Sequence, residues 1–145
     1  MTILQKLKVG LTTESAEQTR ALAAELASAL PPDTTLALHG DMGVGKTTFV
    51  QGLAQGFGVS EHVTSPTFAI YSIYQGSERT LVHLDAYRLE KKSALDELLI
   101  EEFLQTPWCL AVEWPDKTGD WLPAHAWHLT LSIVAGDRHH LVLRW

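Results

Sequence analysis

The first clear pattern along the chain is helical. The stretch SAEQTRALAAELASAL, residues 15–30, consists mainly of alanine and leucine with polar residues between them, and PPD follows it. That composition favours a helix, and Ser15 with Gln18 three positions later fits a capping box at its start. We therefore predict a helix from Ser15 to about residue 30.

A short apolar run and a second helical segment flank a glycine-rich loop. TLALH, residues 35–39, has the character of a strand that runs straight into the loop. The following helix is predicted from Lys46 to Gln55, because Gly56 and Gly58 then act as stop signals.

Further strands are expected in the second half. TFAIYSIY (67–74) and TLVHLDAY (80–87) are rich in β-branched and aromatic residues and predict a hairpin. CLAVEW (109–114) is almost entirely apolar, as expected for a strand covered on both faces. The final stretch, 127–145, has the pattern of an antiparallel hairpin around AGDR.

One more helix is predicted over residues 93–104. Helical spacing there places Leu95, Leu98, Leu99 and Phe103 on one face, with acidic residues opposite.

These elements alternate early in the chain and pair locally later. The order predicts an α/β fold: a three-layer, P-loop NTPase-like domain with a mixed, mainly parallel sheet and a C-terminal antiparallel hairpin. We expect one domain over residues 1–145.

Composition narrows the classes of function. Hydrophobic residues make up 46% and charged residues 19%, and the formal net charge is −6. The densest basic cluster is Arg88, Lys91 and Lys92, followed by an acidic segment. A protein that grips nucleic acid unaided normally has a basic face, so direct tRNA or DNA binding is disfavoured.

The N-terminus and the apolar runs give no sign of membrane targeting. The longest apolar runs span about five to seven residues, too few to cross a bilayer, and no secretory signal precedes them. The single cysteine, Cys109, excludes an internal disulfide and is expected to be a buried, inert thiol. We therefore expect a cytoplasmic protein without membrane contact.

The glycine-rich loop carries the strongest chemical signal. GDMGVGKT, from Gly40 to Thr47, matches G-x-x-x-x-G-K-[ST] at every fixed position. Glycines let successive N–H groups turn toward phosphate oxygens, and the following helix N-terminus favours negative charge. Lys46 would reach the β- and γ-phosphates, and Thr47 would bind Mg²⁺. The alternative, a glycine-rich turn with an accidental Lys-Thr pair, is disfavoured by the flanking strand and helix.

Two strands end in an acid. Asp85 ends LVHLD and Glu113 ends CLAVE. Ligands of open α/β sheets lie beyond the carboxyl ends of parallel strands, so either acid could face the phosphates. Spacing alone does not decide which one supports Mg²⁺ and which one activates water. A solvated strand end, or a salt bridge such as Asp85 to Arg88, remains possible for each.

A third feature is VTSPTF, which holds Thr64, Ser65 and Thr67 around a proline. Such a segment can follow the γ-phosphate as a switch does. On its chemistry alone, a simple turn that opens a strand is the preferred interpretation.

Four segments in fixed order make the chain resemble a known family. They are GDMGVGKTTFVQGLAQGFG, VTSPTF, LVHLDAYRL and VEWPDK. Together they resemble the TsaE family, the small P-loop ATPases of bacterial tRNA threonylcarbamoyladenosine modification. The resemblance covers essentially the whole chain.

The resemblance implies a set of site residues. ATP and Mg²⁺ would occupy the loop, with Thr47 and Glu113 as metal ligands. Asp85 would then be the base that orients water, acting beside Lys46. Ser65 and Thr67 would form a switch-like segment, which reverses the preference stated above. The nucleotide-binding residues implied are Asp41, Met42, Gly43, Val44, Gly45, Lys46, Thr47, Thr48, Arg138 and Ala16, with Trp114 packing near the site.

The resemblance also implies partners. Proteins of this family act with TsaD-like and TsaB-like proteins on tRNAs that read codons beginning with adenine, and tRNA contact can be left mainly to those partners. ATP hydrolysis would be weak without them.

Three other interpretations stay open at this point. A P-loop small-molecule kinase shares the loop, although the five arginines are scattered. A GTP-dependent switch usually carries Asn-Lys-x-Asp, which PDKTGD lacks. A nucleotide-gated docking module would use Asp85 and Glu113 only to shape the site.

Overall fold

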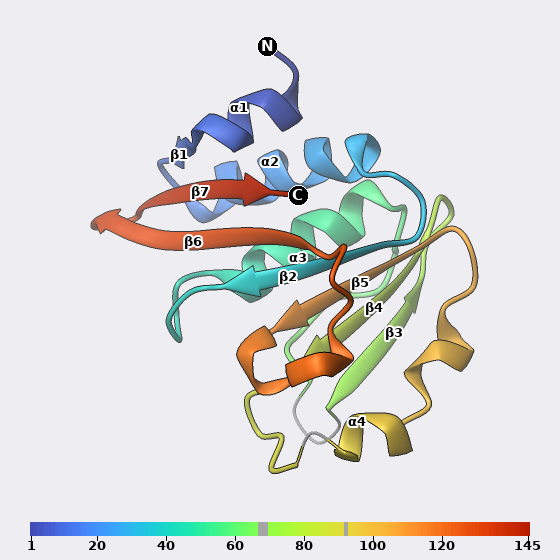
Figure 1. Ribbon diagram of the computed structural model, residues 1–145. Helices are drawn as coiled ribbons and strands as arrows, with labels where there is room; N and C mark the ends of the chain where they lie inside the picture. The colour runs from blue at the N-terminus through green and yellow to red at the C-terminus, as the bar shows by residue number, and fades with distance from the viewer. Residues whose placement is uncertain (67–69, 92) are drawn as a thin grey trace.

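The computed structural model describes residues 1–66, 70–91 and 93–145, and within these ranges it contains one seven-stranded sheet (Figure 1). The strands are β1 (Leu11–Thr13), β2 (Thr34–His39), β3 (Tyr71–Gln75), β4 (Thr80–Asp85), β5 (Trp108–Glu113), β6 (Trp127–Ala135) and β7 (Arg138–Arg144). Their order across the sheet is β1-β7-β6-β2-β5-β4-β3.

The centre of the sheet is parallel and its edges are antiparallel. Strand β2 pairs in parallel with β5 and with β6, and β5 pairs in parallel with β4. Strands β1, β3 and β7 run antiparallel to their neighbours. The predicted mixed sheet and the C-terminal hairpin of β6 and β7 are therefore confirmed, with the parallel pairing confined to the four central strands.

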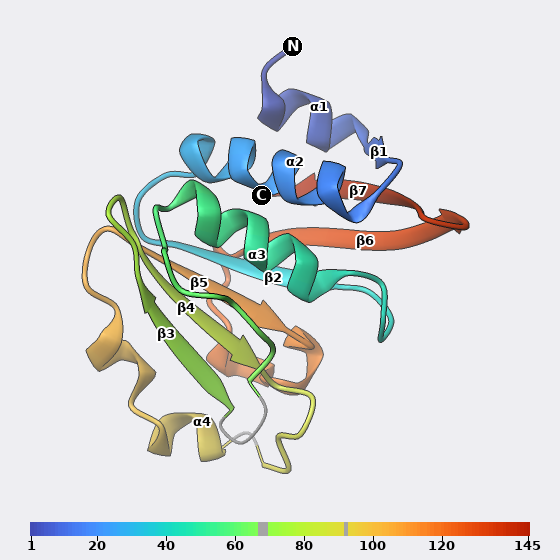
Figure 2. The ribbon, with the colours of Figure 1, turned by 180° about the vertical axis from the view of Figure 1, so that it is seen from behind.

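Helices cover both faces of the sheet. They are α1 (Ile3–Val9), α2 (Ala16–Ala29), α3 (Lys46–Gly56) and α4 (Ser93–Glu97), with short 3-10 segments at η1 (Ile100–Phe103), η2 (Pro115–Lys117) and η3 (Gly119–Trp121). Helices α2 and α3 lie on one face (Figure 2). Helix α4 and η1 pack on the other face, over β4 and β5. The three layers predicted from the sequence are confirmed.

Helix α2 begins where its capping signal predicts. The Ser15 hydroxyl accepts from the Gln18 backbone N–H at 3.1 Å, which satisfies one of the free donors of the first turn. The Gln18 side chain accepts from the N–H of Glu14 instead of that of Ser15. The helix then packs closely on α3, because a Cβ at Gly52 would lie 2.4 Å from the carbonyl oxygen of Arg20.

The prediction of a single helix over residues 93–104 is wrong. The chain forms α4 and then η1, and between them Leu99 has a φ of 51°. That left-handed conformation ends an α-helix. Of the predicted apolar face, Leu95 is fully buried and Leu98 packs against the core, whereas Leu99 is 52% exposed and Phe103 is 38% exposed. Ile100, which was not assigned to that face, is fully buried instead.

Other predicted boundaries of strands and helices need smaller corrections. Strand β4 ends at Asp85 rather than at residue 87, and β3 begins at Tyr71, whereas residues 67–69 of the predicted strand lie outside the described ranges. Helix α1 and strand β1 were not predicted. Among the described residues, no helix is long and apolar enough to cross a membrane.

Candidate functional site

The phosphate-binding loop joins β2 to α3. Gly43 and Gly45 have φ values of 79° and 102°, a region that glycine enters without the steric penalty of a Cβ. Gly45 is the N-cap of α3 and makes no side-chain cap hydrogen bond. The first N–H groups of α3 are therefore not taken up by a capping side chain, which is the arrangement of an anion site at a helix N-terminus.

Lys46 is held inside the site rather than in solvent. It is only 4% exposed, and its Nζ donates to the Gly40 carbonyl oxygen at 2.8 Å. The same ammonium lies 3.8 Å from the centroid of the Trp114 ring, a cation–π contact. Burial lowers the pKa of Lys46, and the carboxylates of Glu113, Asp85 and Asp41 act in the opposite direction.

Trp114 owes its place over Lys46 to an unusual backbone conformation. Its φ is 56°, and a left-handed conformation costs a non-glycine residue roughly 1–2 kcal/mol. The ring also packs against Tyr87, with centroids 5.2 Å apart. Trp114 therefore lines the same cavity as Lys46.

The strand register brings the two predicted acids together. Asp85 and Glu113 are paired at the ends of β4 and β5. Side chains alternate between the faces of a strand, and Leu81 of β4 and Ala111 of β5 pack in the cluster that includes α3. Asp85 and Glu113 lie an even number of residues further along, so both point to the face where α3 begins.

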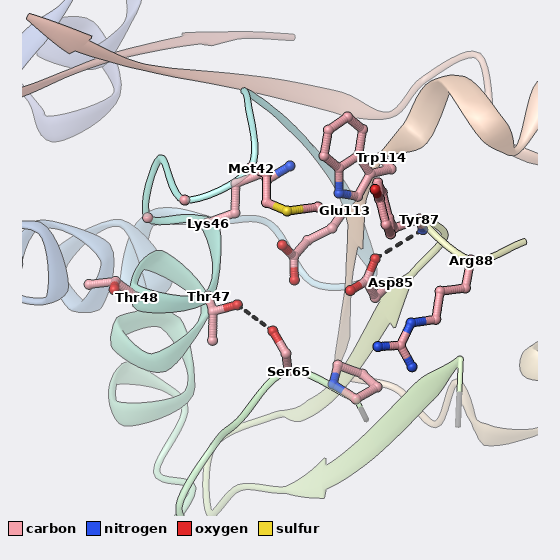
Figure 3. Close-up of a pocket in the computed structure, with 13 residues that line it drawn as sticks. Met42, Lys46, Thr47, Thr48, Ser65, Asp85, Tyr87, Arg88, Glu113 and Trp114 are labelled. Atoms are coloured by element: carbon pink, nitrogen blue, oxygen red, sulfur yellow. Dashed lines mark hydrogen bonds between the residues drawn. The ribbon is translucent and has the colours of Figure 1, made fainter. Parts of the chain in front are cut away.

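The two acids nevertheless have different surroundings. Glu113 is 4% exposed, and its Oε2 accepts from Nε2 of His83 at 2.5 Å. Asp85 is half-buried, and its Oδ1 accepts from the Tyr87 backbone N–H at 3.0 Å. Figure 3 shows both carboxylates beside Lys46 and Thr47.

Thr47 and the segment before β3 also meet here. The Thr47 hydroxyl and the Ser65 hydroxyl are 2.7 Å apart (Figure 3). The predicted switch-like segment thus touches the loop at Ser65. Thr67, the other residue of that prediction, lies outside the described residues.

These groups line one cavity of about 490 Å³. Four segments contribute to it: the loop, residues 65–66, the end of β4 and the end of β5. The lining residues are Met42, Gly43, Gly45, Lys46, Thr47, Thr48, Ser65, Pro66, Asp85, Tyr87, Arg88, Glu113 and Trp114.

Some predicted nucleotide-binding residues do not line the main cavity. Val44 is 3% exposed and packs in the core, and its N–H donates to the Asp41 carbonyl oxygen at 3.1 Å. Asp41 lines a smaller cavity that adjoins Lys46 and Trp114. Arg138 pairs with Glu14 at 3.2 Å, directly before α2, so the β6–β7 turn and the exposed Ala16 are close in space without lining the main cavity.

Sequence reasoning did not single out three residues of the site. Tyr87 and Arg88 line the cavity, and His83 holds Glu113. All three stand in LVHLDAYRL, so the motif contained them. Only the tertiary structure revealed their contacts.

The donor set fits a hard divalent cation. Within the described residues no three His, Cys, Asp or Glu side chains converge as a metal cage. The Thr47 hydroxyl and the carboxylates of Glu113 and Asp85 face one cavity instead. Mg²⁺ is commonly bound by one or two carboxylates together with substrate phosphates and water, so these oxygen donors suit Mg²⁺ carried with a nucleotide.

Comparison with known proteins gives consistent matches. The family model for the threonylcarbamoyl adenosine biosynthesis protein TsaE matches residues 13–140. The tRNA threonylcarbamoyladenosine biosynthesis protein TsaE of Bacillus subtilis (strain 168) is 33% identical over 129 residues, which cover 89% of this chain and 80% of that protein. The protein of the same name from Nostoc sp. (strain PCC 7120) is 38% identical over 120 residues, covering 81% and 73%.

A solved structure agrees with the sequence matches. The crystal structure of Bacillus subtilis YdiB superposes with a TM-score of 0.74 at 32% identity, covering 91% of this chain and 81% of that one. With its phosphate-binding loop, its paired acids and these matches, the chain belongs to the TsaE family.

Proposed function

We propose that this chain binds and hydrolyses ATP with Mg²⁺ as a component of tRNA N6-threonylcarbamoyladenosine biosynthesis. One observation carries the proposal: the loop, the Thr47 hydroxyl and the carboxylates of Asp85 and Glu113 line the same cavity. The relatives are named for this tRNA modification, and they do not support the alternative of a small-molecule kinase.

The loop supplies the phosphate contacts. Backbone N–H groups of residues 41–48 surround the phosphates, and the N-terminus of α3 adds its positive end. Lys46 moves from the Gly40 carbonyl oxygen to the β- and γ-phosphates, which its position at the cavity wall supports. Arg138 and Ala16, at the start of α2, flank the adenosine. This assignment rests on the ion pair between Arg138 and Glu14, which brings Arg138 close to the start of α2.

Thr47 and Glu113 hold the cation. Bound there, Mg²⁺ neutralises charge on the phosphate oxygens. The Ser65 hydroxyl is hydrogen-bonded to the Thr47 hydroxyl. When Thr47 binds the cation instead, this hydrogen bond is lost, which is how the switch-like segment of Ser65 and Thr67 would sense the cation.

Asp85 orients and deprotonates water. Its carboxylate accepts a proton as the water oxygen forms a bond to the γ-phosphorus and the bond from that phosphorus to the β,γ-bridging oxygen breaks. The products are ADP and inorganic phosphate. Lys46 stabilises the charge that develops on the leaving oxygens.

Partners explain how an acidic chain serves a tRNA. With a net charge of −6, the surface is poorly suited to hold a polyanion alone. We propose that TsaD-like and TsaB-like proteins form an ATP-dependent complex with this chain and make most of the tRNA contacts.

The test is ATP hydrolysis by the purified chain, alone and with the TsaD-like and TsaB-like proteins of the same source. We expect a low rate alone and a several-fold rise with both partners, together with ATP-dependent co-elution. An unchanged rate with no complex would refute the proposal. Transfer of the γ-phosphate to a nucleoside or sugar would instead indicate a kinase, and equal competition by GTP would indicate a GTP-dependent switch.

A further inference from the structure

The pair of His83 and Glu113 lies directly beneath the proposed cation site. His83 is fully buried, and the Glu113 side chain is 6% exposed. His83 lies opposite Ala111 in the parallel pairing of β4 and β5, while Glu113 lies opposite Asp85. The imidazole of His83, on β4, therefore reaches diagonally across to Glu113, which lies two residues nearer the carboxyl end of the neighbouring strand β5.

The neighbours of His83 on the same face of the sheet are apolar, so they do not explain why a polar ring is buried there. Leu81, Cys109 and Ala111, on the same face of the two strands, are apolar and fully buried. A buried polar group is costly unless it is hydrogen-bonded, and Nδ1 of His83 has no partner among the described residues. The contact of Nε2 with Glu113 is therefore the polar interaction that accounts for a histidine at this position.

That contact also limits what the Glu113 carboxylate can do. Because a carboxylate only accepts, Nε2–H of His83 donates to Oε2 at 2.5 Å. One oxygen is thus committed to the protein interior. The other, Oε1, is left for the cavity that Glu113 lines with Thr47. A hydrogen bond from a neighbouring side chain commonly orients a metal-binding group in this way.

We propose that His83 is a positioning residue: by holding Oε2 of Glu113, it directs Oε1 to the cation that accompanies the nucleotide. This role rests on the proposed function, because it requires Glu113 to bind that cation. His83 itself touches neither the nucleotide nor the cation.

The test measures cation binding separately from turnover. Mn²⁺ is titrated by electron paramagnetic resonance in the presence of saturating ADP, and ADP affinity is measured separately in EDTA. We expect His83→Leu to weaken Mn²⁺ binding by about tenfold to a hundredfold and to leave ADP affinity in EDTA unchanged. His83→Gln should restore most of the affinity, since its amide N–H reaches as far as Nε2, whereas the shorter His83→Asn should not.

Cys109→Ala is the matched control, because it removes volume from the same buried face without touching Glu113. It should bind Mn²⁺ as the wild type does. Wild-type Mn²⁺ affinity in folded His83→Leu would overturn the proposed role, as would equal affinities in the Gln and Asn variants. If His83→Leu does not fold, the contrast between Gln and Asn decides. If the wild type itself fails to bind Mn²⁺ with ADP, the proposed function fails and this role with it.

Discussion

At the scale of single residues, the two acids at the strand ends are chemically alike and structurally different. Glu113 is buried and held by His83, which suits a ligand that must keep one orientation. Asp85 is more exposed than Glu113, and its Oδ1 accepts the backbone N–H of Tyr87, so its carboxylate is the more accessible of the two to a water molecule. This contrast supports the division of roles proposed for them.

Asp85→Asn tests that division. The amide keeps the shape of the side chain but is a far weaker proton acceptor, so ATP affinity should stay within about threefold while the rate of hydrolysis with partners falls by about 10²–10⁴. Nucleotide titration and phosphate release measure the two quantities. Asp120→Asn, an exposed acid in η3, is the control and should leave both unchanged. Loss of binding in Asp85→Asn would assign Asp85 to the nucleotide or cation instead.

The thiol of Cys109 should be inert in the folded protein. Complete burial raises its pKa to about 12, so at pH 8 almost none is thiolate, the form that reacts. We expect a disulfide reagent such as DTNB to label it only as fast as the protein opens, and at once in denaturing urea. Rapid labelling of the native protein would contradict the buried position of β5.

At the scale of elements, the sequence predicted the structure correctly where a hydrogen bond or a backbone conformation depends only on residues next to one another in the chain. Ser15 begins α2 by bonding its own first turn, and the glycines of the loop adopt the conformations that the motif needs. The segment 93–104 is different: it forms α4 and η1, which pack on the second face, with Leu99 in a left-handed conformation between them. An isolated helix of the predicted length, about 12 residues, is only marginally stable in water, so local helical preference does not decide the conformation of this segment.

Close packing of α2 on α3 gives a prediction at this scale. Gly52→Ala would bring a Cβ to 2.4 Å from the Arg20 carbonyl oxygen, so the helices must move apart. We expect a loss of about 1–3 kcal/mol in the free energy of unfolding, although alanine favours a helix by up to about 1 kcal/mol over glycine. Urea unfolding followed by circular dichroism measures it.

Gln55→Ala is the control on the same helix. Gln55 is exposed, so the substitution should change the free energy of unfolding by no more than about 0.5 kcal/mol. Equal effects in the two variants would show that the α2–α3 contact is looser than the structure indicates.

At the scale of the whole molecule, the site joins segments that are far apart in sequence. The sheet order places β2, β5 and β4 side by side, so a ligand at their ends links the loop to both acids. Binding of a nucleotide should therefore stabilise the fold as a whole.

MgADP at 100 times its dissociation constant should stabilise the folded state by about 2.7 kcal/mol, which raises Tm by roughly 5–11 °C for a chain of this size. Differential scanning calorimetry measures the shift. Lys46→Ala should abolish it, because the loop loses its charge for the phosphates. Lys6→Ala, on the distant helix α1, should retain it. A full shift in Lys46→Ala would place the nucleotide outside the loop.

The sequence by itself determined those features that depend on neighbouring residues along the chain. The loop from Gly40 to Thr47, the helix start at Ser15 and the positions of Asp85 and Glu113 at strand ends could all be predicted, because φ preferences, capping and hydrophobic patterning are local. The three layers and the C-terminal hairpin followed from the order of such elements.

Only the tertiary structure decided which side chains meet. The pairing of Asp85 with Glu113, the hold of His83 on Glu113 and the cation–π contact of Lys46 with Trp114 all join residues distant in sequence. Each depends on strand register, where a slip of one residue would turn every side chain to the opposite face. Register is set by the packing of the whole sheet between its helices, and no single segment of the sequence contains it.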